Sequence, residues 1–168
     1  MTLDLNNIKT QIKSILDTAN TTTASPVDLS ANLTTRIQQV FKTNIERIPI
    51  QASLYPAVTI FFDSKSIEPA TIVKDQRTAL RKAEVDVKIV GLTWNPNFET
   101  VTEDPADEDL ENLMENIEEI LRNNSTINSL CSWSMPTDIT YHSGTFDEET
   151  HLRAGIMNYK LSIFYRGL

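Results

Sequence analysis

One stretch of the chain, Tyr55-Pro-Ala-Val-Thr-Ile-Phe-Phe-Asp63, is apolar on both faces of an extended segment. Successive side chains of a strand point to opposite faces of its sheet, so Ile60 and Phe61 fall on different faces here. Both faces must therefore be covered, as they are for a strand inside a sheet. We expect this stretch to be the central strand. Pro56 fits only the first position of this strand, because proline has no N–H to donate to the hydrogen-bond ladder.

The next extended segment lies between Arg81 and Trp94. It alternates apolar residues such as Val85 with charged residues such as Glu84, which is the pattern of a half-buried strand. We expect it to pair along the whole central strand. Residues 64–80 then form a connection much longer than a turn needs, and connections of that length are usually functional or disordered.

Two segments have the three- and four-residue apolar spacing of amphipathic helices. The first runs from Leu3 to Leu16. The second begins at Pro105, which suits the first position of a helix, and ends near Asn123. Asp104 is placed to cap it, and the acidic residues of its first turns oppose the positive end of the helix dipole. We expect both helices to pack on the sheet.

Three further segments complete the predicted order. Residues 34–42 have helical apolar spacing but are rich in β-branched residues, and we assign them to a strand. Residues 137–142 are a further strand, and residues 157–165 alternate strictly between apolar and polar side chains. The order helix, strand, strand, strand, helix, strand, strand predicts an α+β fold, with two helices on a largely antiparallel sheet of four to five strands.

Length and charge limit the classes of function. A chain of 168 residues is about the size of one domain. No run approaches the ~18 apolar residues of a membrane span, and the amino terminus lacks the pattern of a secretory signal, so we expect a cytosolic protein without membrane contact. The single Cys131 can form no internal disulfide. A net charge of −8 argues against a protein that grips a phosphate backbone.

Candidate catalytic and metal-ligating residues are sparse. His142 and His151 have carboxylates nearby in sequence, but no His-Glu-x-x-His motif is present, and an exposed hairpin loop accounts for residues 143–151 more simply. Cys131 stands among apolar residues and reads as a small buried hydrophobic side chain rather than a nucleophile. The four glycines form no phosphate-binding loop. We therefore predict no enzyme activity, no metal and no cofactor.

The strongest charge run places nine acidic residues between Glu103 and Glu119. One interpretation is a solvated helix face. The other is an acidic wall beside a DNA channel, which would repel phosphates and let DNA slide without sticking. The sequence leaves both open.

The chain resembles the tail terminator, or tail-completion, proteins of long-tailed bacteriophages in four features taken together. These are Leu-Tyr-Pro-Ala-Val-Thr-Ile-Phe-Phe at 54–62, the alternating strand at 83–94, the acidic helix at 105–123 and the alternating final strand. The resemblance covers almost the whole chain. It implies one domain over residues 1–168 that assembles into a ring, usually of six copies, on the last turn of the tail tube. Residues 25–49 and 95–104 depart from the family pattern.

The resemblance also implies partners and a location. The ring would stop tube growth and join the tail to the head connector or stopper protein, so its partners are copies of itself, the tail tube protein and that connector. Double-stranded DNA would pass through the lumen without specific binding. The protein would belong to the tail or neck of the virion, and to the host cytoplasm during assembly. A small cytosolic enzyme or ligand-binding module of an unrelated family is the alternative.

Extended loops are predicted at residues 64–81 and 95–104. The segment 64–82 holds five basic residues against two acidic ones, a balance of +3, so the rest of the chain carries −8 − 3 = −11. It also contains apolar residues that a purely solvated loop does not need. We interpret it as a docking arm of the ring, although a mobile surface loop is the simpler alternative. The candidate interface residues are Lys65, Ile67, Ile72, Lys74, Arg77 and Arg81.

Overall fold

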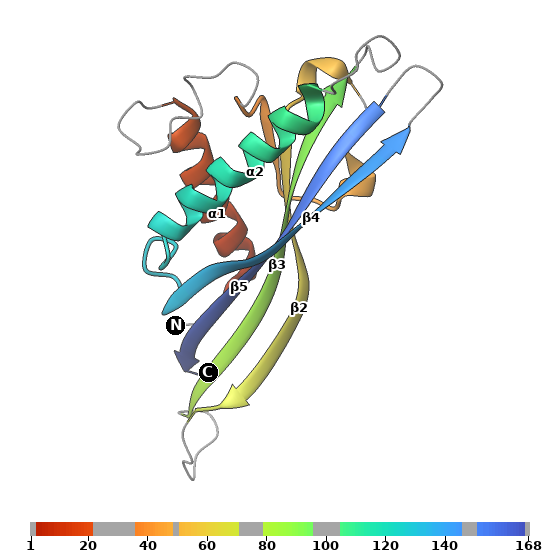
Figure 1. The fold of residues 1–168 in the computed structure, drawn as a ribbon. Helices are drawn as coiled ribbons and strands as arrows, with labels where there is room; N and C mark the ends of the chain where they lie inside the picture. The colour runs from red at the N-terminus through yellow and green to blue at the C-terminus, as the bar shows by residue number, and fades with distance from the viewer. Residues whose placement is uncertain are drawn as a thin grey trace.

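A computed structural model describes residues 3–21, 36–48, 51–70, 79–95, 105–145 and 151–166 (Figure 1). These residues form an α+β fold with two α-helices, two short 3-10 helices and one five-stranded sheet. The elements in chain order are α1 (Leu5–Thr21), β1 (Gln39–Phe41), the 3-10 helices η1 (Ile45–Arg47) and η2 (Ala52–Leu54), β2 (Ala57–Pro69), β3 (Leu80–Asn95), α2 (Pro105–Asn123), β4 (Trp133–Thr145) and β5 (His151–Arg166). The predicted fold class and order of helices and strands are confirmed.

The strand order in the sheet is β1-β2-β3-β5-β4. Only the short β1 runs parallel to its neighbour, and the other pairings are antiparallel. The strand predicted to be central is β2, which lies second from one edge, while β3 takes the middle position. The prediction that β2 is the central strand was wrong, because β2 is apolar on both faces only where neighbouring segments cover it, near its start. Its first residues are covered on one side by the helices and on the other by the segment that follows β1.

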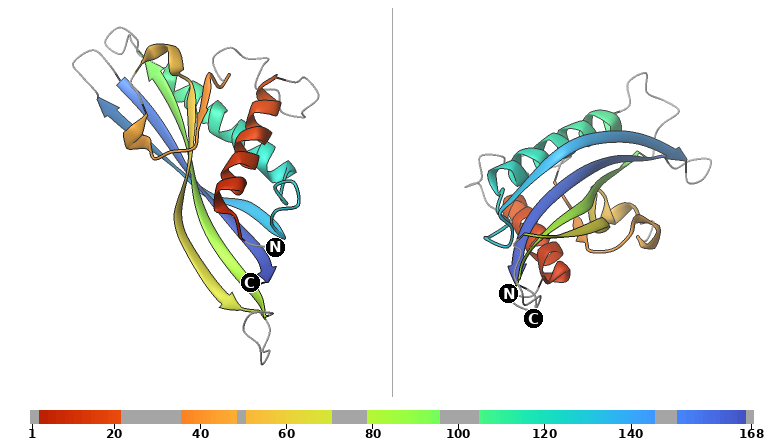
Figure 2. Two further views of the ribbon diagram at one scale, coloured as in Figure 1. Left: turned by 180° about the vertical axis from the view of Figure 1, so that it is seen from behind. Right: turned by 90° about the horizontal axis from the view of Figure 1, so that it is seen from below.

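The middle of the sheet is one uninterrupted ladder. β3 and β5 pair over sixteen consecutive residues, from Leu80↔Arg166 to Asn95↔His151. The outer strands are less regular, because β2 has a register shift between Phe62 and Ser64 and β4 has one between Pro136 and Asp138. Such bulges bend a strand and increase its twist, and the outer strands thereby follow the strong twist of the sheet seen in Figures 1 and 2.

Both helices pack on the same face of the sheet. The view from below in Figure 2 shows α1 and α2 on one side and the two 3-10 helices on the other. α1 lies toward β1 and β2, whereas α2 crosses β3, β5 and β4. The core between helices and sheet is made of fully buried aliphatic residues, among them Ile12, Leu16, Ile60, Val87, Ile89, Leu113, Ile117 and Leu121.

Two glycines allow α2 to approach the sheet closely. Gly91 on β3 and Gly155 on β5 are direct cross-strand partners. A Cβ atom at Gly155 would lie 2.6 Å from Met114 Cγ, and one at Gly91 would lie 2.6 Å from Met114 Sδ. Met114, a fully buried residue of α2, therefore occupies a notch that only a pair of residues without side chains leaves open.

The other face of the sheet is covered over only part of its length. Ile48 and Tyr55, from the segment between β1 and β2, bury Ala57, Val90 and Leu92 there. The Tyr55 ring lies 5.7 Å from that of Trp94, between ring centroids. The expected cover on both sides of residues 57–61 is thus confirmed. Farther along the strands this face carries the polar residues Ser64, Ser66, Glu68, Lys82, Glu84, Asp86, Asn158 and Lys160.

The prediction of a loop at residues 64–81 is wrong at both ends of this segment. Residues 64–69 continue β2 and residues 80–81 begin β3, and these two stretches pair in a β-hairpin, whereas residues 71–78 lie outside the described residues. Ala70 N donates a hydrogen bond to Leu80 O over 2.9 Å and extends the pairing past Pro69. The error arose because Asp63 and Ser64 look like a strand end, whereas a bulge at this point carries the strand onward.

Other boundaries also differ from the sequence prediction. α1 ends at Thr21 rather than near Leu16, and β5 begins at His151 rather than at residue 157, so both ends of the loop predicted at residues 143–151 belong to strands. The strand predicted at residues 34–42 is limited, among the described residues, to Gln39–Phe41. The strand predicted at residues 137–142 is longer and runs from Trp133 to Thr145.

The helix predicted from Pro105 to Asn123 has those bounds in the structure. Its predicted cap Asp104 lies outside the described residues. Of the loop predicted at residues 95–104, Asn95 is the last residue of β3 and the rest lies outside the described residues.

Candidate assembly surfaces

The predicted docking residues that the structure describes lie near one end of the β2–β3 hairpin. We call residues 64–69 of β2 and 80–82 of β3 the distal hairpin. Lys65 and Ile67 pair with Val85 and Ala83, respectively, and Arg81 pairs with Pro69. Directly paired residues share a face of the sheet, so Lys65, Ile67 and Arg81 point to the helix-covered side. Figure 1 shows the hairpin extending past the ends of both helices.

Exposure differs among these three residues. Ile67 is 48 % exposed, which is unusual for a large aliphatic side chain on a strand whose partner Ala83 is fully buried. Lys65 is exposed and Arg81 is half-buried. The structure thus brings these three candidate residues onto one surface. Ile72, Lys74 and Arg77 lie outside the described residues.

The strand β4 forms the edge of the sheet opposite β1. Its outer side pairs with no other strand of the described residues. Three of its side chains are large, apolar and exposed: Trp133 at 42 %, Met135 at 49 % and Tyr141 at 47 %. We call these three residues the β4 edge surface. The register shift after Pro136 reverses the alternation, so Trp133 and Met135 lie on the uncovered face of the sheet and Tyr141 on the helix side.

Proteins usually protect a long edge strand with charges, prolines or bulges. β4 has these features only near its middle, where Pro136, the bulge and the charged Asp138 adjoin, and the stretches around Trp133 and Tyr141 have none of them. An edge with exposed aromatic side chains and little charge is a typical site for a partner chain. This surface was not predicted from the sequence. Trp133, Met135, Ile139 and Tyr141 all stand at odd-numbered positions, as if on one face of a regular strand, but the bulge places the first two on the face opposite to the last two.

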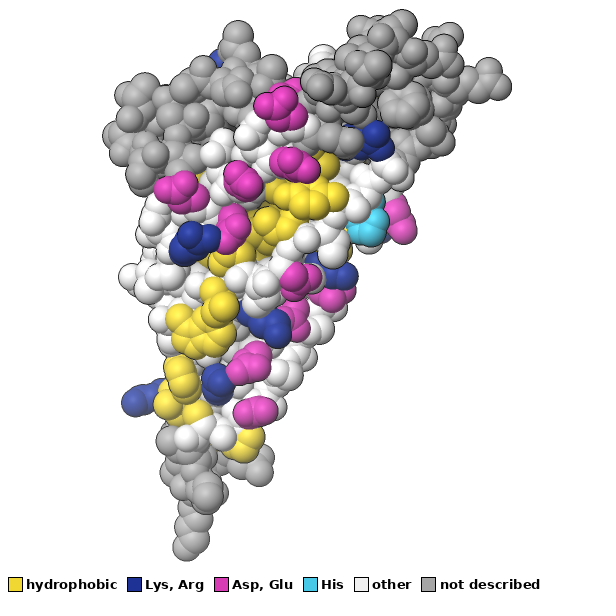
Figure 3. Space-filling model, in the orientation of Figure 1, with side chains coloured by type: hydrophobic (Ala, Val, Ile, Leu, Met, Phe, Trp, Pro, Cys, Tyr) yellow, Lys and Arg dark blue, Asp and Glu magenta, His cyan; other side chains and the backbone are white. Residues whose placement is uncertain are grey.

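Acidic side chains of α2 border the β4 edge surface. The helix contains seven acidic residues and a single basic one, Arg122, which forms an ion pair with Glu118. Glu111 and Glu115 are exposed. α2 packs against β4, so its acidic residues lie close to this edge. Partial burial and the nearby carboxylates of Glu111, Glu115 and Glu118 raise the pKa of the Tyr141 hydroxyl. Figure 3 shows the acidic side chains in a row along α2, beside exposed hydrophobic side chains.

The opposite edge of the sheet has the opposite charge. Arg36, Lys42 and Arg47 are exposed and flank the short strand β1, with Glu46 as the one acidic residue in the same segment. Lys9 of α1 adds a further positive charge, because its Nζ lies 3.4 Å from Lys42 O. We call Lys9, Arg36, Lys42 and Arg47 the β1 edge surface. The molecule is therefore polarised across its sheet, basic beside β1 and acidic beside β4.

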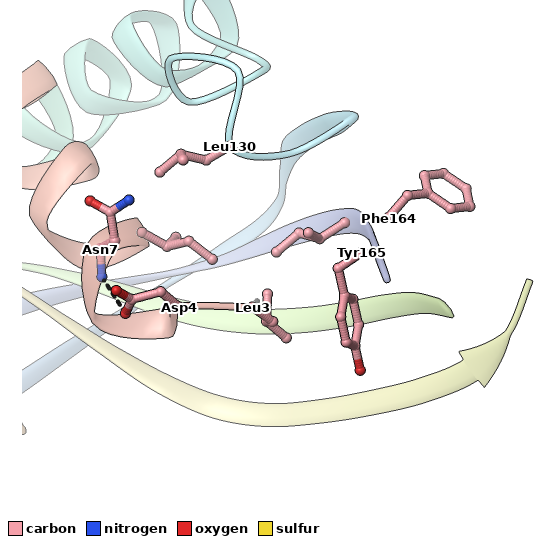
Figure 4. A pocket seen from close by; sticks show the side chains of 8 residues that line it. Leu3, Asp4, Asn7, Leu130, Phe164 and Tyr165 are labelled. Atoms are coloured by element: carbon pink, nitrogen blue, oxygen red, sulfur yellow. Dashed lines mark hydrogen bonds between the residues drawn. The ribbon is translucent and has the colours of Figure 1, made fainter. Parts of the chain in front are cut away.

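A small crevice lies where α1 begins against the end of β5. Figure 4 shows it between Leu3, Leu130 and Tyr165, with the Phe164 ring directed away from it. Asp4 caps the helix here, because its Oδ1 accepts a hydrogen bond from Asn7 N over 3.1 Å. The crevice has a volume of about 30 Å³. That is roughly the volume of one water molecule, so this place is structural rather than a ligand site.

The residues considered for chemistry are separated in the fold. His142 is exposed on β4. Cys131 is buried, and burial raises the pKa of its thiol, an effect that a hydrogen bond from Ser134 partly opposes. A thiol held in its neutral form is a poor nucleophile, which agrees with a packing role. Across the described ranges, no three His, Cys, Asp or Glu side chains are grouped so that they could hold a metal ion.

The chain matches no protein-family model and no curated protein sequence. Neither described helix is both long and apolar enough to cross a membrane.

Proposed function

We propose that this protein is a structural component of a phage virion. Copies of the chain form a ring, of six copies in the family that the sequence resembles, at the head-proximal end of a tail tube. The ring ends tube polymerisation and joins the tail to the head connector or stopper protein. DNA passes through the lumen without specific binding, as suits a chain with a net charge of −8. This role requires no catalytic group and no cofactor.

The observation that carries this proposal is the distal hairpin. It extends past the helices and leaves the apolar residue Ile67 48 % exposed, beside the cation of Lys65. A projecting strand pair with one apolar anchor and neighbouring charge is suited to contact another subunit. The α+β fold is also the one that the family resemblance implies. The hairpin is therefore the part of each copy that contacts the tail tube.

The energetics favour many weak contacts over one strong contact. An exposed charge pair contributes only ~0.2–1 kcal/mol, and its attraction is screened over about 8 Å at physiological ionic strength. Full burial of an exposed aliphatic side chain contributes ~1.5–3 kcal/mol, and Ile67, which is 48 % exposed, would contribute about half of that on contact with a partner. A ring repeats each contact in every copy, so modest contacts at the distal hairpin add up to firm attachment.

Deletion of the gene from the phage or prophage that carries it tests this function. Electron micrographs of the lysate should show tails of irregular length and heads without tails, and a plasmid copy of the gene should restore intact virions. Complementation with Ile67→Ser should restore fewer intact virions than the unaltered gene. Complementation with Ser66→Ala, an exposed neighbour on the other face of the same strand, should match the unaltered gene. Intact virions in the deletion strain would refute the function.

A further inference from the structure

We infer that copies of this chain associate head to tail, with the β4 edge surface and the acidic face of α2 of one copy against the β1 edge surface of the next. This inference rests on the proposed ring and assigns the two surfaces that meet in it. It concerns residues other than the distal hairpin. The occupant of the β4 edge is therefore a second copy of this chain.

Charge selects a second copy in this orientation. The acidic side chains beside β4 and the basic side chains beside β1 lie at opposite edges of one sheet, so a single molecule cannot bring them together. Two copies related by a two-fold axis through β4 would place acidic helices against each other, and like charges in contact are unfavourable. A head-to-tail contact instead pairs acidic residues of α2 such as Glu115 with basic residues on the same face of the next copy such as Lys42, which lies beside α1. Repetition of such a contact gives a ring if the rotation closes.

The exposed aromatic residues give this contact an apolar centre. Trp133 and Tyr141 lie on opposite faces of β4, so a neighbouring copy laid along the edge contacts both. Tryptophan and tyrosine are enriched at the energetically dominant positions of interfaces, while surrounding charges set orientation and association rate. Phe41 and Ile45, partly buried apolar residues on the β1 side, lie on the face without α-helices and are available to meet Trp133, which lies on that face too. The interface thus has an apolar centre and an ionic border.

The first test is self-association of the purified full chain by sedimentation at high protein concentration and low ionic strength. The unaltered protein should form species larger than a monomer, and added salt should dissociate them, since the ionic border is screened. Glu111→Lys with Glu115→Lys, or Lys9→Glu with Lys42→Glu, should each weaken association by about tenfold or more. The four substitutions combined restore opposite charges and should recover association. Arg166→Glu, which reverses an exposed charge of β5 paired with Leu80 and away from both surfaces, is the control and should have no effect.

The second test separates this interface from tube attachment. Trp133→Ser should abolish association in solution, whereas Ile67→Ser should leave it unchanged. Zero-length crosslinking of mixed light and heavy isotope-labelled protein should join carboxylates of α2 to Lys9 or Lys42 of another copy. A chain that stays monomeric at its solubility limit, reversals without effect, or a combined variant that fails to recover would overturn the inference. Head-to-tail association in solution together with normal virions in the deletion strain would uphold the interface and refute only the tail function.

Discussion

The notch formed by Gly91 and Gly155 under Met114 makes a quantitative prediction about packing. Gly155→Ala adds a methyl group 2.6 Å from Met114 Cγ, closer than real Cβ contacts, so the methionine must move. Overpacking of this kind costs ~1–3 kcal/mol. Replacing glycine by alanine where the backbone conformation allows it stabilises the fold by ~0.4–1 kcal/mol, because alanine lowers the conformational entropy of the unfolded chain. The free energy of unfolding should therefore fall by about 1–2 kcal/mol.

The same substitution should have the opposite sign once Met114 is removed. Met114→Ala alone should cost ~2–5 kcal/mol, because the side chain is fully buried. In that background the methyl group of Gly155→Ala enters vacated space, and it should raise the free energy of unfolding by ~0.5–1.5 kcal/mol. The two substitutions should thus be coupled by about 1.5–3.5 kcal/mol.

Equilibrium urea unfolding of the four proteins, followed by circular dichroism, measures this coupling. The denaturant slope should stay constant across the set, so that midpoint shifts report stability alone. Ile12→Ala combined with Gly155→Ala is the control, since Ile12 is buried in α1 and is not among the atoms nearest to Gly155. That pair should be additive within ~0.5 kcal/mol. If Gly155→Ala has the same effect with and without the methionine, Met114 does not fill the notch as described.

Three further outcomes follow from the structure. Because burial raises the pKa of the Cys131 thiol, the native protein should react slowly with a thiol reagent at neutral pH and the urea-unfolded protein quickly, and equal rates would contradict its burial. Burial also raises the pKa of the Tyr159 hydroxyl, so the unfolded chain loses this proton at a lower pH than the native protein does. The contribution of this burial to stability is fully present below pH ~10, and the free energy of unfolding should fall as pH rises above that value. Tyr159→Phe should reduce this alkaline loss, which pH-dependent unfolding measures. Asp4→Ala removes the cap of α1 and should lower the free energy of unfolding by ~0.5–2 kcal/mol, whereas Asp17→Ala at the far end of the helix should cost less.

The sequence was informative where periodicity and local stereochemistry agree. Proline at the first position and an apolar stripe of three- and four-residue spacing located α2 to the residue. Strict alternation located β3 and β5, because a strand with one covered face leaves that pattern. The apolar character of residues 57–61 on both sides correctly predicted cover on each face of the sheet.

Features that depend on partners distant in sequence were not predictable. The bulge between Phe62 and Ser64 lets a polar segment remain in the sheet because β3 supplies the pairing, so strand residues were predicted as loop. The bulge after Pro136 likewise concealed the exposed side of β4. The notch needs Gly91 and Gly155 to be cross-strand neighbours, and this register is fixed only by the complete ladder. The charge difference between the two edges appears only once the strand order is known.

The unbroken ladder of β3 and β5 also has a mechanical consequence. Sixteen consecutive pairs at ~3.3 Å per residue make a ribbon about 50 Å long. Bending this ribbon in its own plane would stretch many hydrogen bonds at once, so it behaves as a strut. A load applied near Leu80 therefore travels along the strut to the level where Met114 anchors α2, without being absorbed by a hinge on the way. A force applied at one end of this ladder is therefore transmitted to its other end.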